Sequence, residues 1–204
     1  MSKLKSNSQL GQDLKVLDYY DNLRGGFYIE LGAFDGIGLS NTLLLQNEYD
    51  WAGVLIEPDR NTYNQLINNR PGNVCVNVPV YSESDKVVTF VESTDPFVSG
   101  IQECQGERQQ HAEVISTYDR KTKTLTQILN DFGAPEDIHY MSLDTEGSEL
   151  DILKGLDFNK YKIGYIDIEH NYIEPYRTDI KNYMISVGYT FKESNQWDDV
   201  YILV

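Results

Sequence analysis

The stretch that decides the fold is Phe27-Tyr28-Ile29-Glu30-Leu31-Gly32-Ala33-Phe34-Asp35-Gly36. Its apolar first half predicts a short buried strand, and its glycines predict a turn directly after it, with two acids, Glu30 and Asp35. A second apolar run ends at Glu57-Pro58. Glu57 follows Gly36 at the roughly 20-residue spacing at which doubly wound folds place an acid against a nucleotide ribose. We therefore predict a parallel sheet that holds an adenosine-type ligand at the carboxyl ends of its strands.

The first turn also indicates which adenosine ligand to expect. A dinucleotide site uses G-x-G-x-x-G, because backbone N–H groups must close on a pyrophosphate. This chain instead has Glu30-x-Gly32-x-x-x-Gly36, with a further acid inside the loop. Carboxylates there repel a pyrophosphate but suit the ammonium and sulfonium of S-adenosylmethionine (SAM). The turn favours SAM over NAD or ATP; the alternative is a glycine-rich turn in some other α/β protein.

Composition limits the partners and the compartment. The 204 residues suffice for one well-cored domain, and the formal charge of −15 is spread along the chain, which argues against nucleic acid as a substrate. No apolar run approaches the roughly 20 residues of a membrane span, and the first residues lack a secretory signal. Cys75 and Cys104 are the only cysteines, so we expect a reduced, cytoplasmic location without a disulfide framework or zinc cluster.

Apolar periodicity predicts alternating strands and helices along the chain. Ser40, Pro175 and Gly188 are suited to helix ends. The final two strands form a hairpin, as in SAM methyltransferases and unlike dehydrogenases of the Rossmann type. We expect strands at 27–32, 52–57, 74–80, 86–92 (an edge strand), 138–143, 163–168, 189–192 and 200–204. We expect helices at 8–23, around Leu43–Leu45, around Tyr63–Ile67, at 125–132, from Leu150 and at 175–187.

The segment 93–122 shows no clear periodicity and is rich in Gln, Glu, Ser and Gly. A loop this long within a compact domain is usually functional or mobile. We predict that residues 1–204 form a single domain in which 93–122 is a lid or substrate-binding insertion.

The cofactor contacts are expected at the strand tips, because ligands bind outside the carboxyl ends of an open parallel sheet. Glu57 is predicted to accept hydrogen bonds from both ribose hydroxyls. Asp35 is within reach of the SAM tail or the ribose. Ser82 is placed for the adenine edge, although hydroxyls at strand ends are more often plain turn formers.

The acceptor site is expected at the next two tips, which carry Asp144, Glu169 and His170. Methyl transfer to a hydroxyl requires in-line approach to the sulfonium and loss of a proton. His170 is the natural base because its reference pKa is near neutral. Alternatively, Asp144, Glu169 and His170 hold one magnesium or manganese ion that lowers the pKa of the hydroxyl. For His170 a hydrogen bond to a neighbouring acid is the structural alternative, and for Glu146 and Glu149 the alternative is a favourable place in the first turn of a helix.

Several motifs in order resemble those of the FkbM-family SAM-dependent methyltransferases. One is Ser142-Leu-Asp144-Thr-Glu146-Gly147-Ser-Glu149, whose Asp-x-Glu-Gly-x-Glu element is the most diagnostic. The others are Ser8-Gln-Leu-Gly11-Gln12-Asp13, Glu30-Leu-Gly-Ala-Phe-Asp35-Gly36, Leu39-Ser40-Asn41-Thr42, Trp51-Ala-Gly-Val-Leu-Ile-Glu57-Pro58 and Ile168-Glu169-His170-Asn171. The resemblance covers nearly the whole chain and is loose over 93–122.

The resemblance implies a class I SAM-methyltransferase (Rossmann-like) fold: a mostly parallel seven-stranded sheet with a C-terminal antiparallel hairpin and helices on both faces. It implies an O-methyltransferase acting on a hydroxyl, commonly of a sugar or polyketide-like product. The related macrocin-type sugar O-methyltransferases hold a metal on acids at the same two strand tips, and here a histidine replaces one of them. The implied SAM site comprises Gln12, Glu30, Gly32, Ala33, Asp35, Gly36, Ser40, Asn41, Glu57 and Pro58. The implied acceptor site comprises Asp144, Glu146, Glu169 and His170.

Three interpretations of different kinds follow. The first is a SAM-dependent O-methyltransferase of a saccharide in a glycan, glycolipid or glycosylated natural product, with Tyr172 and Trp197 placed to touch the acceptor. The chain is then either a whole protein or one module of a larger sugar-processing protein. The second is a nucleotide-dependent oxidoreductase, against which the missing G-x-G-x-x-G argues. The third is a non-catalytic module that binds a protein partner through the same fold, against which the retained acids argue.

Overall fold

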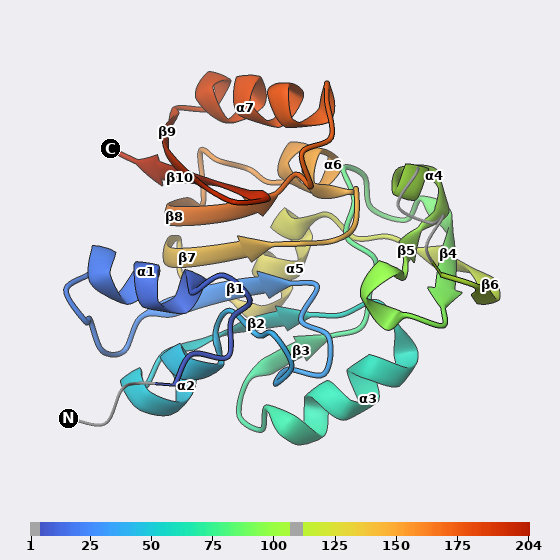
Figure 1. Ribbon diagram of the computed structural model, residues 1–204, viewed down its shortest axis with the longest axis horizontal. Helices are drawn as coiled ribbons and strands as arrows, with labels where there is room; N and C mark the ends of the chain where they lie inside the picture. The colour runs from blue at the N-terminus through green and yellow to red at the C-terminus, as the bar shows by residue number, and fades with distance from the viewer. Residues whose placement is uncertain (1–4, 107–111) are drawn as a thin grey trace.

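A seven-stranded sheet forms the centre of the protein, as Figure 1 shows for the computed structural model, which describes residues 5–106 and 112–204. The strand order is β3-β2-β1-β7-β8-β10-β9. Every neighbouring pair is parallel except those of β10, which runs antiparallel to both β8 and β9. The strands are β1 Phe27–Leu31, β2 Ala52–Ile56, β3 Val74–Val76, β7 Asp137–Leu143, β8 Lys162–Glu169, β9 Tyr189–Asn195 and β10 Asp198–Leu203. This order confirms the predicted class I methyltransferase fold.

Helices cover both faces of this sheet, and each face has its own apolar core. One core packs Val16, Leu45 and Leu66 from the first three helices against the sheet, and the other packs Leu129, Leu153 and Met184 from the last three. Burial of these side chains is the main favourable term in folding. The helices are α1 Gln12–Tyr19, α2 Leu43–Tyr49, α3 Arg60–Asn69, α5 Leu125–Phe132, α6 Glu149–Lys154 and α7 Tyr176–Ser186.

The strand order changes direction at β1, and this positions the site. From β1 the chain adds β2 and β3 on one side, and it then adds β7 and β8 on the other side. β1 lies between β2 and β7, so the turn after β1 lies beside the turns after both neighbours. A Cβ atom on Gly32 would lie 1.8 Å from the carbonyl oxygen of Asp144, and Gly32 has a φ of +76°. Only glycine allows the tips of β1 and β7 to approach this closely.

A second, three-stranded sheet lies beyond the carboxyl ends of the large sheet, on the right in Figure 1. It consists of β4 Val87–Ser93, β5 Gly100–Ile101 and β6 Val114–Lys121, in the order β5-β4-β6. The segments between its strands contain a 3-10 helix, η1 Pro96–Val98, and a short helix, α4 Gln102–Gln105. β4 is therefore the central strand of a separate sheet, and the edge position predicted for 86–92 was wrong.

Other boundaries also differ from the predictions. Much of the segment 93–122 is regular, because β6 pairs with β4 over its length; residues 107–111 of that segment lie outside the described residues. β3 ends at Val76, and the rest of the predicted strand continues as irregular chain toward an isolated bridge at Val80. β9 and β10 extend to a tight turn at Gln196–Trp197, where a longer connection was predicted.

Two expectations from composition can be compared with the structure. Cys75 and Cys104 are both free thiols. Within residues 5–106 and 112–204, no helix has the length and apolar character needed to cross a bilayer.

Candidate active site

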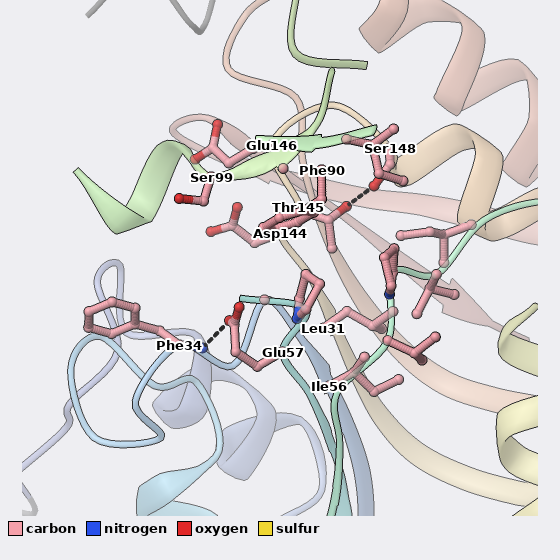
Figure 2. A pocket seen from close by; sticks show the side chains of 18 of the residues that line it. Leu31, Phe34, Ile56, Glu57, Phe90, Ser99, Asp144, Thr145, Glu146 and Ser148 are labelled. Atoms are coloured by element: carbon pink, nitrogen blue, oxygen red, sulfur yellow. Dashed lines mark hydrogen bonds between the residues drawn. The ribbon is translucent and has the colours of Figure 1, made fainter. Parts of the chain in front are cut away.

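Two cavities open where the strands end, and they meet at the tips of β1 and β7. The first is mostly apolar and is lined by Ile56, Phe90 and other side chains drawn in Figure 2, and Val78 and Ile101 also belong to its lining. The second is lined mainly by polar atoms. The residues that line both are Leu31, Gly32, Phe34, Phe97, Asp144 and Glu146.

Glu30, at the end of β1, reaches the polar cavity but is mainly occupied by the loop that follows. Its carboxylate accepts hydrogen bonds from the Ser40 hydroxyl at 3.0 Å, the Asn41 backbone N–H at 2.7 Å and the Thr42 hydroxyl at 2.5 Å. Burial raises the pKa of Glu30, and Arg70 and these donors oppose the rise. Glu30 therefore fixes the shape of the loop on which Ser40 and Asn41 face the cavity.

The positive partner of Glu30 is Arg70, directly after α3, whose side chain is fully buried. Its Nη1 lies 3.8 Å from a Glu30 oxygen and donates to the Gly36 carbonyl and the Ser40 hydroxyl, each at 3.0 Å. Its Nη2 donates to the hydroxyls of Tyr28 and Thr42. A buried ion pair is stable only when such hydrogen bonds satisfy the remaining polar atoms.

Glu57, at the tip of β2, lies on the floor of the apolar cavity next to Pro58 (Figure 2). Its two oxygens accept from the backbone N–H groups of Phe34 at 2.8 Å and Asp59 at 2.7 Å. Burial raises the pKa of Glu57 to about 8 in spite of these donors. A buried carboxylate with remaining acceptor capacity suits neutral hydroxyl groups, such as those of a ribose.

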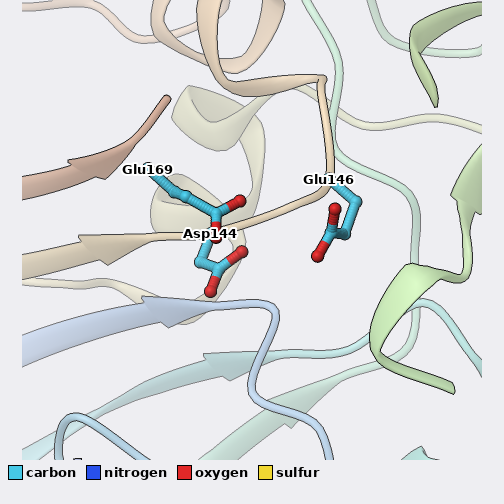
Figure 3. A group of neighbouring side chains, drawn as sticks. All are labelled: Asp144, Glu146 and Glu169. Atoms are coloured by element: carbon cyan, nitrogen blue, oxygen red, sulfur yellow. The ribbon is translucent and has the colours of Figure 1, made fainter. Parts of the chain in front are cut away.

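Three carboxylates gather at the tips of β7 and β8, as Figure 3 shows for Asp144, Glu146 and Glu169. Each offers an oxygen, and these oxygens lie within 4.8 Å of one another. Burial, followed by the charges of Asp144 and Glu146, raises the pKa of Glu169. Like charges this close are stable only with a shared proton or a bound cation. The oxygen set is one that magnesium or manganese prefers.

The structure does not bring His170 into this cluster. The imidazole is buried on the side of β10, where its Nε2 lies 3.3 Å from an Asp199 oxygen and its Nδ1 accepts from the Tyr172 backbone N–H at 2.9 Å. Among the described residues that line the two cavities, His170 is not included. His170 thus lies beside a neighbouring acid, as in its structural alternative. The predicted metal set of Asp144, Glu169 and His170 was wrong in its third member, whose place in the cluster is taken by Glu146.

Comparison with known proteins identifies the family of this chain. A sequence model of the methyltransferase FkbM domain matches residues 30–191. The chain belongs to the FkbM methyltransferase family. It is therefore a SAM-dependent methyltransferase, and the oxidoreductase interpretation is not retained. No curated protein sequence matches this FkbM methyltransferase.

Solved structures similar to this FkbM methyltransferase share its fold at low sequence identity. The precorrin-6y C5,15-methyltransferase of Geobacter metallireducens GS-15 has 12% identity and a TM-score of 0.51, over 99% of this chain and 89% of that one. A candidate RNA methyltransferase from Pyrococcus horikoshii has 11% identity and a TM-score of 0.50, over 100% and 94% of the two chains. At this identity the likeness shows the fold alone.

The other predicted cofactor residues divide into two groups. Gly32, Ala33, Ser40 and Asn41 line the polar cavity, and the Nδ2 of Asn41 donates to the Ser142 hydroxyl at 2.8 Å. The remaining residues are not among those lining either cavity; they are Gln12, Asp35, Gly36 and Ser82. Gln12 donates to Asp198 at 2.8 Å, and Asp35 accepts from the N–H groups of Ile37 and Gly38 within its own turn.

The two predicted acceptor contacts lie outside the cavity linings as well. Tyr172 is exposed and packs edge-on to His170, and Trp197 lies in the turn between β9 and β10, where its carbonyl accepts from the His170 N–H. Glu149 accepts from the backbone N–H groups of Thr145 and Gly147 and from the Tyr176 hydroxyl, so it shapes the turn after β7.

Sequence reasoning missed several lining residues, of which four are named here, and one organising residue of the site. Gln9, Ser142, Phe90 and Phe97 line the cavities, and Arg70 supports them. Gln9 and Ser142 had a usable signal, since Gln9 lies in the same motif as Gln12 and Ser142 begins the motif that contains Asp144. Arg70 follows a polar helix segment that resembles a solvated surface.

Proposed function

We propose that this FkbM methyltransferase transfers the methyl group of SAM to a hydroxyl of a saccharide, such as a deoxyhexose in a glycan or glycolipid. The observation that carries the proposal is the group of three acids, Asp144, Glu146 and Glu169, at the junction of an apolar and a polar cavity. A SAM molecule that spans the junction has its adenosine in the apolar cavity and its methionine tail beside the β1 turn. Its sulfonium then lies near the acids.

The proposed chemistry assigns a role to each part of the site. Glu57 accepts from the ribose hydroxyls, and Asn41 and the Gly32 turn hold the amino-acid tail. The acceptor hydroxyl approaches the methyl carbon in line with the carbon–sulfur bond. As the new carbon–oxygen bond forms and the carbon–sulfur bond breaks, Asp144 takes the proton of the hydroxyl. S-adenosylhomocysteine and the methyl ether are the products.

A divalent metal fits the acid cluster. Its ligands would be Asp144, Glu146 and Glu169, and His170 would not take part because its ring faces Asp199. A magnesium or manganese ion held there would supply a positive charge that lowers the pKa of an acceptor hydroxyl. The all-oxygen donor set, close enough for one ion, supports this part of the proposal.

The charge of the cavities supports a neutral acceptor. Among the described residues that line the two cavities, none is Lys, Arg or His, whereas Glu30, Asp144, Glu146 and Glu169 are acids. An anionic acceptor would be repelled by such a lining. Together with the net charge of −15, this supports an uncharged saccharide and opposes nucleic acid.

The test combines binding with product detection. Calorimetry with S-adenosylhomocysteine, and separately with NAD, measures cofactor choice. Mass spectrometry then follows methylation of neutral methyl glycosides, uronic acids and RNA, with and without magnesium or manganese. We expect binding of the homocysteine ligand alone and methylation of a neutral glycoside by wild type and by the exposed-site control Glu48→Gln. Asp144→Asn should bind the ligand and lose turnover.

Two results would overturn the proposal. Absence of S-adenosylhomocysteine binding would favour the partner-binding module. Methylation of RNA in preference to every glycoside would reject the saccharide acceptor while leaving the cofactor assignment intact.

A further inference from the structure

The aromatic pair Phe34 and Phe97 connects the cofactor turn with the small sheet. Their ring centroids are 4.4 Å apart with an interplanar angle of 30°, which is a stacked arrangement. Phe34 belongs to the turn after β1 and Phe97 to η1, and both line both cavities. Figure 2 shows Phe34 beside Glu57, with the segment that carries Ser99 above it.

Phe97 is 44% exposed although it contacts Phe34. A single exposed apolar side chain is common on protein surfaces and needs no explanation by itself. Phe97 differs because its exposed ring borders a polar cavity that also contains Asp144, Glu146 and Glu169. One part of the cavity wall is therefore an aromatic ring and another part is made of carboxylates.

The segment that carries Phe97 is held by its own hydrogen bonds. Asp95 accepts from the Phe97 backbone N–H at 3.2 Å, and the Ser99 hydroxyl accepts from the Ser93 N–H at 3.1 Å. The buried Gln105 donates to the Val98 carbonyl at 2.6 Å. The ring is thus presented from a shaped turn, and Phe34 supports it from the other side.

We propose that Phe97, supported by Phe34, is the platform on which the acceptor saccharide packs the C–H face of its ring. A pyranose has polar edges and at least one patch of C–H groups, and aromatic rings pack against such patches. With its C–H patch on Phe97, the sugar directs edge hydroxyls toward the carboxylates of the polar cavity. Phe97 is then a specificity-determining residue that selects a cyclic sugar with an unbroken apolar patch. The inference rests on the proposed saccharide acceptor.

The test uses saturation-transfer NMR, which detects contact without turnover. The protein, saturated with S-adenosylhomocysteine, is mixed with methyl α-L-rhamnopyranoside or with the acyclic polyol sorbitol, and the aromatic protons are irradiated. We expect saturation transfer to the C–H protons of the glycoside and little saturation transfer to sorbitol. In Phe97→Ala the dissociation constant of the glycoside should rise about 2- to 10-fold, and Phe97→Tyr should restore it. Phe132→Ala removes a ring that is 49% exposed on α5, outside both cavity linings, and should change nothing.

Each other outcome overturns the platform. Equal glycoside affinity in wild type and Phe97→Ala would remove Phe97 from the acceptor site. A matching loss of S-adenosylhomocysteine affinity in Phe97→Ala would assign the ring to the cofactor. Absence of any saturation transfer to the glycoside in the wild-type complex would also reject the platform. Failure of the proposed function is distinguished by wild-type calorimetry with S-adenosylhomocysteine and by the product screen, neither of which depends on Phe97.

Discussion

Replacement of Gly32 by alanine should destabilise the protein and damage the site at once. The added Cβ would lie 1.8 Å from the Asp144 carbonyl oxygen and 3.0 Å from its carbon. These are backbone atoms, so no rotation of a side chain relieves the contact, and the tips of β1 and β7 must separate. Alanine at the φ of +76° adds a left-handed backbone cost of about 1–2 kcal/mol. Overpacking adds about 1–3 kcal/mol.

The expected loss for Gly32→Ala is therefore about 2–5 kcal/mol, out of a total unfolding free energy of about 5–15 kcal/mol. Gly72→Ala is the matched control, since Gly72 has a φ of +87° and no atom within 4 Å of its virtual Cβ. Gly72→Ala should lose only the backbone contribution to the unfolding free energy, about 1–2 kcal/mol. The difference between the two variants isolates the contact with Asp144.

Urea unfolding of both variants measures this difference, and calorimetry with S-adenosylhomocysteine measures the site. We expect Gly32→Ala to lose at least about 10-fold in affinity, equivalent to 1.4 kcal/mol, while Gly72→Ala binds as wild type does. Equal unfolding free energies for the two variants, or full ligand affinity in Gly32→Ala, would refute the close approach of the two strand tips as the reason for this glycine.

Four further predictions concern individual carboxylates and His170. Measured above pH 8, where Glu57 is ionised, Glu57→Gln should weaken S-adenosylhomocysteine binding about 10-fold or more, because a charge-assisted hydrogen bond contributes about 1.5–3 kcal/mol; equal heats of binding at equal concentrations would exclude the ribose contact. The raised pKa of Glu57 favours its neutral form in the folded state, so the contribution of Glu57 to stability should be complete below pH 4.5 and lost as the pH rises to about 8. Between these two pH values, the urea midpoint of Glu57→Gln should therefore change less with pH than that of wild type. Burial similarly raises the pKa of Asp167 to about 7, so Asp167→Asn should reduce the decline in stability between pH 3.8 and about 7 while ligand affinity stays unchanged; a steeper decline would show the opposite sign. His170→Gln should keep turnover within about three-fold, because the imidazole faces Asp199 and not the cavities; a loss comparable to that of Asp144→Asn, with ligand binding intact, would return His170 to the mechanism.

The sequence predicted the large sheet well because its strands are strongly apolar and end in recognisable turns. Gly32, Glu57 and Asp144 were each assigned to a strand tip, and strand adjacency then brings the tips together. The small sheet was harder to predict, since no residue of β6 is buried and its eight positions are only exposed or half-buried. Its pairing with β4 depends on tertiary contacts that no local pattern contains.

At the site, the direction of the side chains was the feature that the sequence predicted least well. His170 follows a strand directly, and beyond the strand end the two-residue alternation no longer determines which way a side chain points. Gln9 and Gln12 lie in one motif, yet Gln9 lines the polar cavity and Gln12 binds Asp198. The importance of Arg70 could not be predicted either, because its partners come from β1, the loop after it and α2, all distant in the sequence.

The buried Arg70 also defines which part of this fold could be transplanted into another scaffold. The β1 turn would carry Glu30 into its new host without the guanidinium that compensates its charge, because Arg70 follows a different helix. An engineer who grafts the turn alone would import an uncompensated buried acid, and the usual cost of breaking such a pair is about 3–5 kcal/mol. The smallest portable unit therefore extends from β1 through Arg70, the residue directly after α3.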